Sequence, residues 1–122
     1  GTLLNNGQIC WLNSRILAPR RRYTEIVDTI TELARSLTIG DPLDPQTKIG
    51  PLVSSRQRER VEGYIATGRS EGRLTTGGSR PDGFDRGWFV EPTVFADVDN
   101  NATISREEIF GPIVPFQKVS SD

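Results

Sequence analysis

The sequence contains no histidine, no methionine and a single cysteine, Cys10, among its 122 residues. Without histidine, the chain by itself cannot build a cysteine–histidine dyad or a zinc site of the cysteine/histidine type. One cysteine excludes an intrachain disulfide, which fits a reducing compartment, so we expect a cytoplasmic protein. Any activation of Cys10 must come from backbone dipoles, neighbouring cations or groups outside this chain.

The chain also lacks a charge excess and long apolar runs. Fifteen Lys and Arg residues stand against sixteen Asp and Glu residues, so no basic field indicates a nucleic acid or a membrane surface as a partner. No run has the length of a transmembrane helix, and no signal peptide is recognisable. Hydrophobic residues make up 34% of the chain, which is low for a self-contained globular domain. We expect no nucleic-acid partner, no membrane association and one modest domain or part of one.

The cysteine lies in a distinctive local sequence, Asn5-Asn6-Gly7-Gln8-Ile9-Cys10. Glycine lets the backbone approach a ligand closely or adopt a positive φ angle, and the amides add neutral donors and acceptors. A lone cysteine in this setting is a candidate nucleophile. The alternative is a buried structural thiol, which residue type alone favours because free cysteine is among the most buried residues.

Two helices are predicted. Apolar residues recur at three- and four-residue steps over 23–37, as in an amphipathic helix, and Gly40 with the prolines that follow ends it. Tyr23, Ile26, Ile30, Leu33 and Leu37 form this stripe, with Val27 and Ala34 beside it. The second helix begins near Ser54, the expected N-cap, and Gln57 is expected to reach back to it in a capping box. Val61, Tyr64 and Ile65 are expected to form its apolar face.

Short β-type runs alternate with these helices. They are 15–18, 74–76, 88–90, 93–95 and 113–116. Strands that alternate with helices favour an α/β layer architecture. The stretch between Gly40 and Pro51 is a long surface loop in this interpretation.

A second motif far downstream favours the interpretation of Cys10 as a nucleophile over that of a buried structural thiol. Together, Gly7-Gln8-Ile9-Cys10 and the segment 107–112 resemble the aldehyde dehydrogenase superfamily, the first its active-site cysteine motif and the second its cofactor-contacting motif. Further similar segments, in the family's order and spacing, are Gly40-Asp41-Pro42, 49–53, Gly63-Tyr64-Ile65 and 89–94. The resemblance covers essentially the whole chain. It implies an α/β fold with helices on a mostly parallel sheet, as part of the catalytic domain.

The resemblance implies a thiol mechanism in which Cys10 adds to an aldehyde and passes through a thiohemiacetal and a thioester to a carboxylic acid. The implied cofactor is NAD or NADP. Glu108 is similar to the glutamate that accepts hydrogen bonds from the nicotinamide ribose, and Phe110 to the aromatic that packs beside the nicotinamide ring. From residue type alone, Glu107 and Glu108 would be a solvated acidic pair, and we expect Glu107 to be structural or exposed.

Five further residues take weaker roles from the resemblance. Gln57 and Arg60 are similar in position to a glutamine and a lysine near the cofactor ribose, although arginine replaces the lysine and a capping box also explains Gln57. Leu4, Ile9 and Trp11 stand at offsets that line the family's aldehyde tunnel, and Trp11 has packing into the core as its alternative. No metal site is expected.

Members of this family are several times longer and carry a cofactor-binding domain upstream. We therefore expect residues 1–122 to be a partial, cysteine-bearing catalytic domain that lacks the cofactor-binding domain, is inactive alone and belongs to a homo-oligomer. Two alternatives stay open. One is a free-standing truncated domain that acts as an oligomerisation or interaction module, and the other is a redox-sensing thiol protein.

Overall fold

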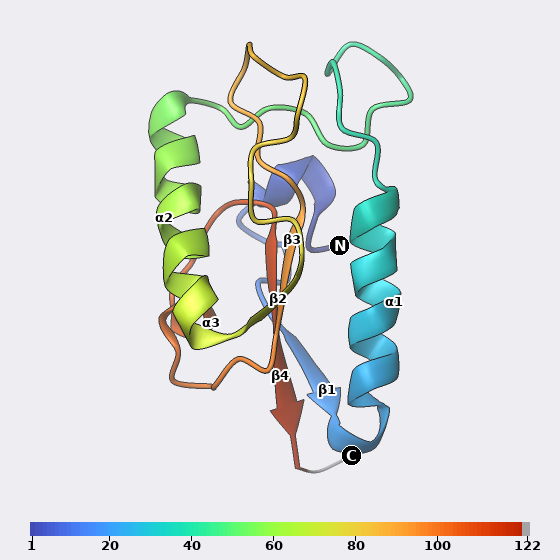
Figure 1. Ribbon diagram of the computed structural model, residues 1–122, viewed down its shortest axis with the longest axis vertical. Helices are drawn as coiled ribbons and strands as arrows, with labels where there is room; N and C mark the ends of the chain where they lie inside the picture. Colours follow the sequence, from blue (N-terminus) through green and yellow to red (C-terminus); the bar gives the residue numbers. More distant parts are fainter. Residues whose placement is uncertain (121–122) are drawn as a thin grey trace.

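A four-stranded sheet forms the centre of the computed structural model, which describes residues 1–120 (Figure 1). The strands are β1 (Ile16–Pro19), β2 (Arg73–Thr76), β3 (Thr93–Ala96) and β4 (Ile113–Val119), in the spatial order β1-β4-β3-β2. β1 and β3 both run parallel to β4, whereas β2 is antiparallel to β3. The sheet is mostly parallel, and the predicted α/β fold is confirmed.

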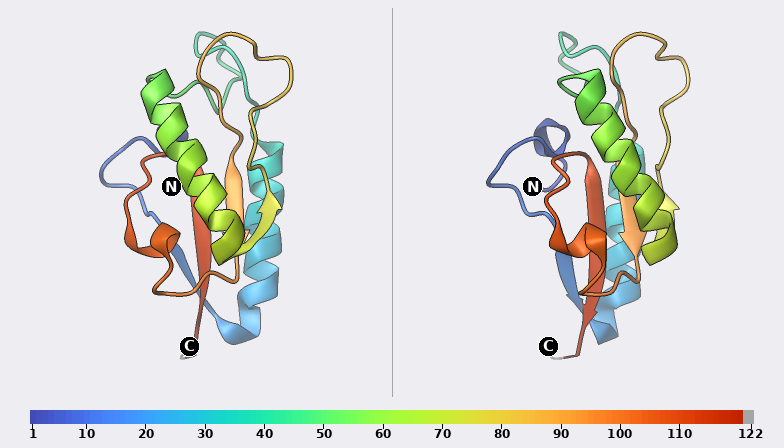
Figure 2. Two further views of the ribbon diagram at one scale, coloured as in Figure 1. Left: turned by 60° about the vertical axis from the view of Figure 1, so that its left-hand side comes forward. Right: turned by 90° about the vertical axis from the view of Figure 1, so that its left-hand side faces the viewer.

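Helices cover both faces of this sheet (Figure 2). Helix α1 (Tyr23–Ser36) lies on one face, and α2 (Ser55–Glu71) with the short α3 (Thr103–Arg106) lies on the other. Two 3-10 turns, η1 (Leu4–Gly7) and η2 (Arg20–Arg22), precede β1 and α1. Each predicted helix is therefore present, and α1 ends with a main-chain bond from the Leu37 N–H to the Ala34 carbonyl, before Gly40.

The strand side chains alternate between two hydrophobic clusters, as the two-residue period of a strand requires. Val94 and Val114 pack with Val27 of α1. Phe95 and Ile113 point to the opposite face and pack against α2 and α3. Because both faces are covered, these strands read in the sequence as continuous apolar runs.

The helical stripe predicted for 23–37 is rotated in the structure. The buried residues of α1 are Tyr23, Val27, Thr31 and Ala34. Leu33 is 51% exposed instead, and it lines an apolar groove of about 610 Å³ between α1, β1 and the N-terminal residues. The prediction chose the most apolar stripe, whereas the smaller side chains are the ones that allow close approach to the sheet.

The β-type run 88–90 is not a strand, so that prediction is wrong. Phe89 and Val90 are buried, but their segment is a loop, and Val90 packs with Val61 and Ile65 of α2. The Trp88 carbonyl accepts a hydrogen bond from the Leu52 N–H at 2.8 Å rather than from a neighbouring strand. Burial of apolar side chains produced the β-like pattern without a ladder of hydrogen bonds.

Half of the predicted capping box is present at the start of α2. The Ser54 hydroxyl accepts a hydrogen bond from the Gln57 N–H at 3.1 Å, which is the N-cap interaction. The Gln57 side chain does not return to Ser54, and its amide nitrogen donates to a carbonyl in another loop. Within residues 1–120 no helix is long and apolar enough to cross a membrane.

Candidate functional site

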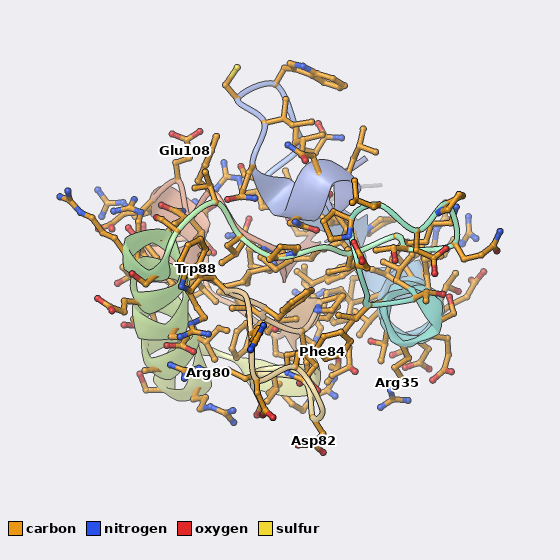
Figure 3. The ribbon with its side chains drawn as sticks, turned by 90° about the horizontal axis from the view of Figure 1, so that it is seen from above. Arg35, Arg80, Asp82, Phe84, Trp88 and Glu108 are labelled. Atoms are coloured by element: carbon orange, nitrogen blue, oxygen red, sulfur yellow. The ribbon has the colours of Figure 1, made fainter. Side chains whose placement is uncertain are left out.

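Two loops far apart in the sequence meet at the end of the sheet where β1 and β4 begin. The cysteine loop (residues 1–15) leads into β1, and the glutamate loop (residues 107–112) leads into β4. Because β1 and β4 are parallel neighbours, with Ile16 opposite Phe116, the segments that precede them lie at the same end of the sheet, where both strands begin. In the view from above, Glu108 projects from the molecule on the side where the N-terminal segment lies (Figure 3).

The two loops touch through their main chains. Asn5, Asn6 and Gly7 have φ angles of 48°, 57° and 74°, in the left-handed region that asparagine and glycine tolerate best. A β-carbon on Gly7 would overlap the Gly111 carbonyl, and one on Gly111 would lie 2.5 Å from the Val61 side chain. Two glycines thus allow the cysteine loop, the glutamate loop and α2 to stack directly.

Side-chain amides fasten the cysteine loop to residues 49–53. Asn6 is only 6% exposed, and its amide donates to the Pro51 carbonyl at 3.0 Å while it accepts from the Gly50 N–H at 3.1 Å. The Gln8 side-chain oxygen accepts from the Val53 N–H at 3.2 Å. The amides flanking the glycine therefore hold the loop in place, while Cys10 itself is exposed.

A small cleft of about 30 Å³ separates the two loops. Gly7 and Ile9 line it from the cysteine loop, and Glu108 and Phe110 line it from the glutamate loop. Cys10 follows Ile9 directly and is exposed, so the interpretation as a buried structural thiol is wrong. The structure brings Ile9, Glu108 and Phe110 together at this cleft, and Cys10 is the residue after Ile9.

Leu4 and Trp11 do not line this cleft. Leu4 is 58% exposed and belongs to the apolar groove beside α1. Trp11 is 72% exposed, and the alternative that it packs into the core is wrong. Both side chains are available to an apolar or flat ligand, while their place in an aldehyde tunnel stays a prediction.

Three side chains of α2 hold the glutamate loop. The contacts are Gln57 Nε2 to the Phe110 carbonyl oxygen at 2.8 Å, Arg60 Nη2 to the Glu108 carbonyl oxygen at 2.8 Å, and the Tyr64 hydroxyl to the Glu107 carboxylate at 2.6 Å. Gln57 and Arg60 therefore bind the main chain of the loop in this structure. Their predicted contacts with a cofactor stay predictions, and Gln57 has a structural task other than the capping box.

The two adjacent glutamates differ in their surroundings. The hydrogen bond to the Glu107 carboxylate, aided by partial burial, raises the pKa of Tyr64 above its usual value. The Arg60 guanidinium lies 5.1 Å from the centre of the Tyr64 ring, a cation–π arrangement, and donates to its hydroxyl at 3.3 Å. Glu108 is exposed, and within residues 1–120 its carboxylate has no hydrogen bond or ion pair. Its two oxygens are free to accept from a ligand.

The described residues contain no group of three or more Cys, Asp or Glu side chains that could hold a metal ion. The chemistry that these side chains offer is that of a free carboxylate that lines the cleft and of an exposed thiol on the residue after Ile9.

Comparison with known proteins shows which family the chain belongs to. The sequence profile of the aldehyde dehydrogenase family matches residues 1–122. The chain belongs to the aldehyde dehydrogenase family. It is 52% identical to a geranial dehydrogenase of Castellaniella defragrans over 113 residues, which is 93% of this chain and 23% of that relative.

Solved aldehyde dehydrogenases share the fold. The Mycobacterium tuberculosis aldehyde dehydrogenase in complex with NAD+ matches with a TM-score of 0.96 and 52% identity, over 99% of this chain and 25% of that one. Aldehyde dehydrogenase C from Pseudomonas syringae, in complex with NAD+ and octanal, matches with a TM-score of 0.95 and 34% identity, over 98% and 25% of the two chains. The chain spans about a quarter of the length of these relatives.

Sequence reasoning about this aldehyde dehydrogenase segment missed the parts that build the site. It assigned no contact to Asn6 or Gln8, and it placed Tyr64 on the apolar face of the second helix without a partner for its hydroxyl. The Tyr64 ring does pack against the core, while its hydroxyl binds Glu107. The available signal was the spacing of polar side chains at 57, 60 and 64, which places them on one stripe of a helix beside the apolar stripe of Val61 and Ile65.

Proposed function

We propose that residues 1–122 form the cysteine-bearing part of a longer NAD(P)-dependent aldehyde dehydrogenase that oxidises an aldehyde to a carboxylic acid, with Cys10 as the nucleophile. The observation that carries this proposal is the meeting of the cysteine loop with the glutamate loop. An exposed thiol follows Ile9, which shares a cleft with Glu108 and Phe110. Family membership and the NAD+ and octanal of the Pseudomonas syringae relative support the same assignment.

In the proposed reaction the Cys10 thiolate forms a bond to the carbonyl carbon, and the oxygen becomes the oxyanion of a thiohemiacetal. The Cys10 N–H makes no main-chain hydrogen bond within residues 1–120, so it is available as a donor to this oxyanion. Loss of hydride from the carbon leaves a thioester on Cys10. Attack by water then breaks the carbon–sulfur bond, releases the acid and returns the thiol.

The free carboxylate of Glu108 fits a nicotinamide cofactor, which would supply the hydride acceptor. Two carboxylate oxygens suit the neighbouring hydroxyls of a ribose, and Phe110 lines the same cleft with its ring. In the family the residue that activates water and a second oxyanion donor lie upstream of this segment. The 122-residue chain alone is therefore inactive in this proposal.

The apolar surface beside α1 favours association of the protein with further copies of itself. Leu4, Leu17 and Leu33 are each more than half exposed and meet at the apolar groove beside α1. β1 is an edge strand of the sheet next to this groove, and exposed edges and apolar patches promote association. We propose a homo-oligomer for the longer protein and association of the isolated chain, which sedimentation at several concentrations would detect.

A chimera tests the catalytic proposal. Residues 1–122 replace the matching segment of the Mycobacterium tuberculosis relative, which has the same fold at 52% identity. We expect NAD-dependent oxidation of aldehydes by the chimera and loss of that oxidation in its Cys10→Ser variant, with the unfolding temperature unchanged. A Cys10→Ser chimera that keeps the activity of the unsubstituted chimera would contradict the assignment of the nucleophile.

A further inference from the structure

One stripe of α2 is directed at the glutamate loop. Gln57, Arg60 and Tyr64 follow each other at steps of three and four residues, so they share one face of the helix. The adjacent stripe, with Val61 and Ile65, is buried in the core. The core contacts therefore fix the rotation of α2, and this rotation fixes where the three polar side chains lie.

The glutamate loop needs such support because its own backbone is irregular. Phe110 has a φ angle of 61°, a left-handed conformation that costs a residue with a β-carbon about 1 kcal/mol or more. The carbonyl of this same residue accepts the hydrogen bond from Gln57. The Arg60 bond holds the carbonyl of Glu108 two residues earlier. Together the two bonds fix the main chain on both sides of Ile109.

The contact of Tyr64 is of a different kind, because it binds a side chain. Its hydroxyl donates to the carboxylate of Glu107 at 2.6 Å, a short distance typical of a charge-assisted hydrogen bond. The neighbouring Glu108 carboxylate is left without a hydrogen bond among the described residues. Both glutamates line the cleft, but the Glu107 carboxylate is anchored to α2 and the Glu108 carboxylate is free to accept from a ligand.

We propose that Tyr64 is a positioning residue, which anchors Glu107 so that Glu108 is held in the orientation that receives the cofactor ribose. This inference rests on the proposed function and adds a role to two residues, Tyr64 and Glu107, to which that function assigns no contact with the cofactor. Arg60 supports the anchor by donating to the Tyr64 hydroxyl and to the Glu108 carbonyl from the same nitrogen. Loss of the Tyr64 hydroxyl would leave the fold and the Gln57 bond in place but free the Glu107 side chain, which loosens the first half of the glutamate loop.

The test compares Tyr64→Phe with the unsubstituted chimera. We expect the KM for NAD to rise and the rate of hydride transfer to fall about tenfold, because small displacements next to a reacting carbon have large effects on rate. A primary deuterium isotope effect from deuterated aldehyde should grow, while the unfolding temperature stays within a few degrees. Arg56→Gln is the matched control, since Arg56 is exposed on the same helix and should leave all three quantities unchanged.

The double variant of Tyr64 and Glu107 distinguishes a positioning role of Tyr64 from a general loss of structure. Glu107→Ala should reproduce the kinetic change of Tyr64→Phe, and the two substitutions together should be no worse than either alone. Additive effects, or a Tyr64→Phe variant that loses stability while its kinetics stay unchanged, would overturn the inference.

Hydrogen exchange of the glutamate loop provides a measurement that does not need activity. In the 122-residue chain, Tyr64→Phe should speed amide exchange over residues 107–111 and leave exchange in β3 unchanged. Unchanged exchange in the loop would overturn the anchor even if the chimera is active. An inactive chimera whose loop exchange still responds to Tyr64→Phe would instead count against the proposed function.

Discussion

Gly7 and Gly111 lie in direct main-chain contact, so that a β-carbon on Gly7 would overlap the carbonyl oxygen of Gly111. This contact joins the loop that carries Cys10 to the loop that carries Glu108. The position of the thiol relative to the carboxylate therefore depends on two residues without side chains.

Gly7→Ala should destabilise the 122-residue chain by about 3 kcal/mol, because it adds a steric overlap to the cost of a positive φ angle. Urea unfolding followed by tryptophan fluorescence at one fixed protein concentration would measure this change. Gly83→Ala is the control for the backbone alone, since its φ is 82° and no atom lies within 4 Å of the added carbon. Gly63→Ala in α2 meets no atom either and should stabilise the chain by about 0.5–1 kcal/mol. Equal losses for Gly7→Ala and Gly83→Ala would contradict the contact.

Asn6→Ala should lower the free energy of unfolding by about 1–2 kcal/mol, because it leaves the partly buried N–H of Gly50 and carbonyl of Pro51 without their side-chain partner. Asn5→Ala is the matched control. Asn5 also has a positive φ, but it is exposed and makes one long hydrogen bond of 3.4 Å. The difference between the two variants reports the amide contacts of Asn6, and no difference would mean that these contacts contribute nothing.

Glu108→Gln in the chimera should slow hydride transfer more than it weakens NAD binding, with a loss of rate of about a hundredfold at most. One altered contact to the ribose changes the placement of the ring but leaves most of the binding surface intact. Stopped-flow formation of NADH with deuterated and ordinary aldehyde would measure the step. Glu107→Gln keeps an oxygen that can accept from Tyr64, and it should have a small effect. If Glu107→Gln has the larger effect, the assignment within the pair is wrong.

The ion pair between Arg80 and Glu62 should make stability depend on pH. Arg80 donates to both carboxylate oxygens, at 2.5 and 3.0 Å, and this hydrogen bonding lowers the pKa of Glu62. A lowered carboxyl pKa contributes stability above the unfolded value near 4.5, and this contribution disappears as the pH falls through the lower folded value. Arg80→Gln should therefore lower the free energy of unfolding slightly at pH 7, as loss of an exposed pair does, and leave it unchanged at acidic pH.

Unfolding of the Arg80→Gln variant in urea across the acidic range would show the effect of the pair. Arg86→Gln removes a second exposed cation from the same loop and should show no such dependence on pH. A constant difference between Arg80→Gln and the unsubstituted chain at every pH would exclude the Glu62 carboxylate as the source.

The sequence by itself determined the family, the α/β class and most element positions of this protein. Motifs such as Gly7-Gln8-Ile9-Cys10 are local, and the periodicity of a helix or a buried strand is also local. Both can therefore be recognised from the sequence alone. The choice of Glu108 over Glu107 also came from a local motif, and the structure adds a physical difference between the two carboxylates.

Only the tertiary structure decided which side chains hold the site together. The parallel pairing of β1 with β4 places the cysteine loop beside the glutamate loop, and no local pattern specifies that pairing. The task of Gln57 depended on a carbonyl 53 positions away, so sequence reasoning gave it the nearer partner Ser54. Likewise, Phe89 and Val90 resemble a strand because they are buried, while a strand also requires a neighbour to bond with. Contacts between distant segments carry most of the specificity of this site, and their partners are set by packing rather than by sequence proximity.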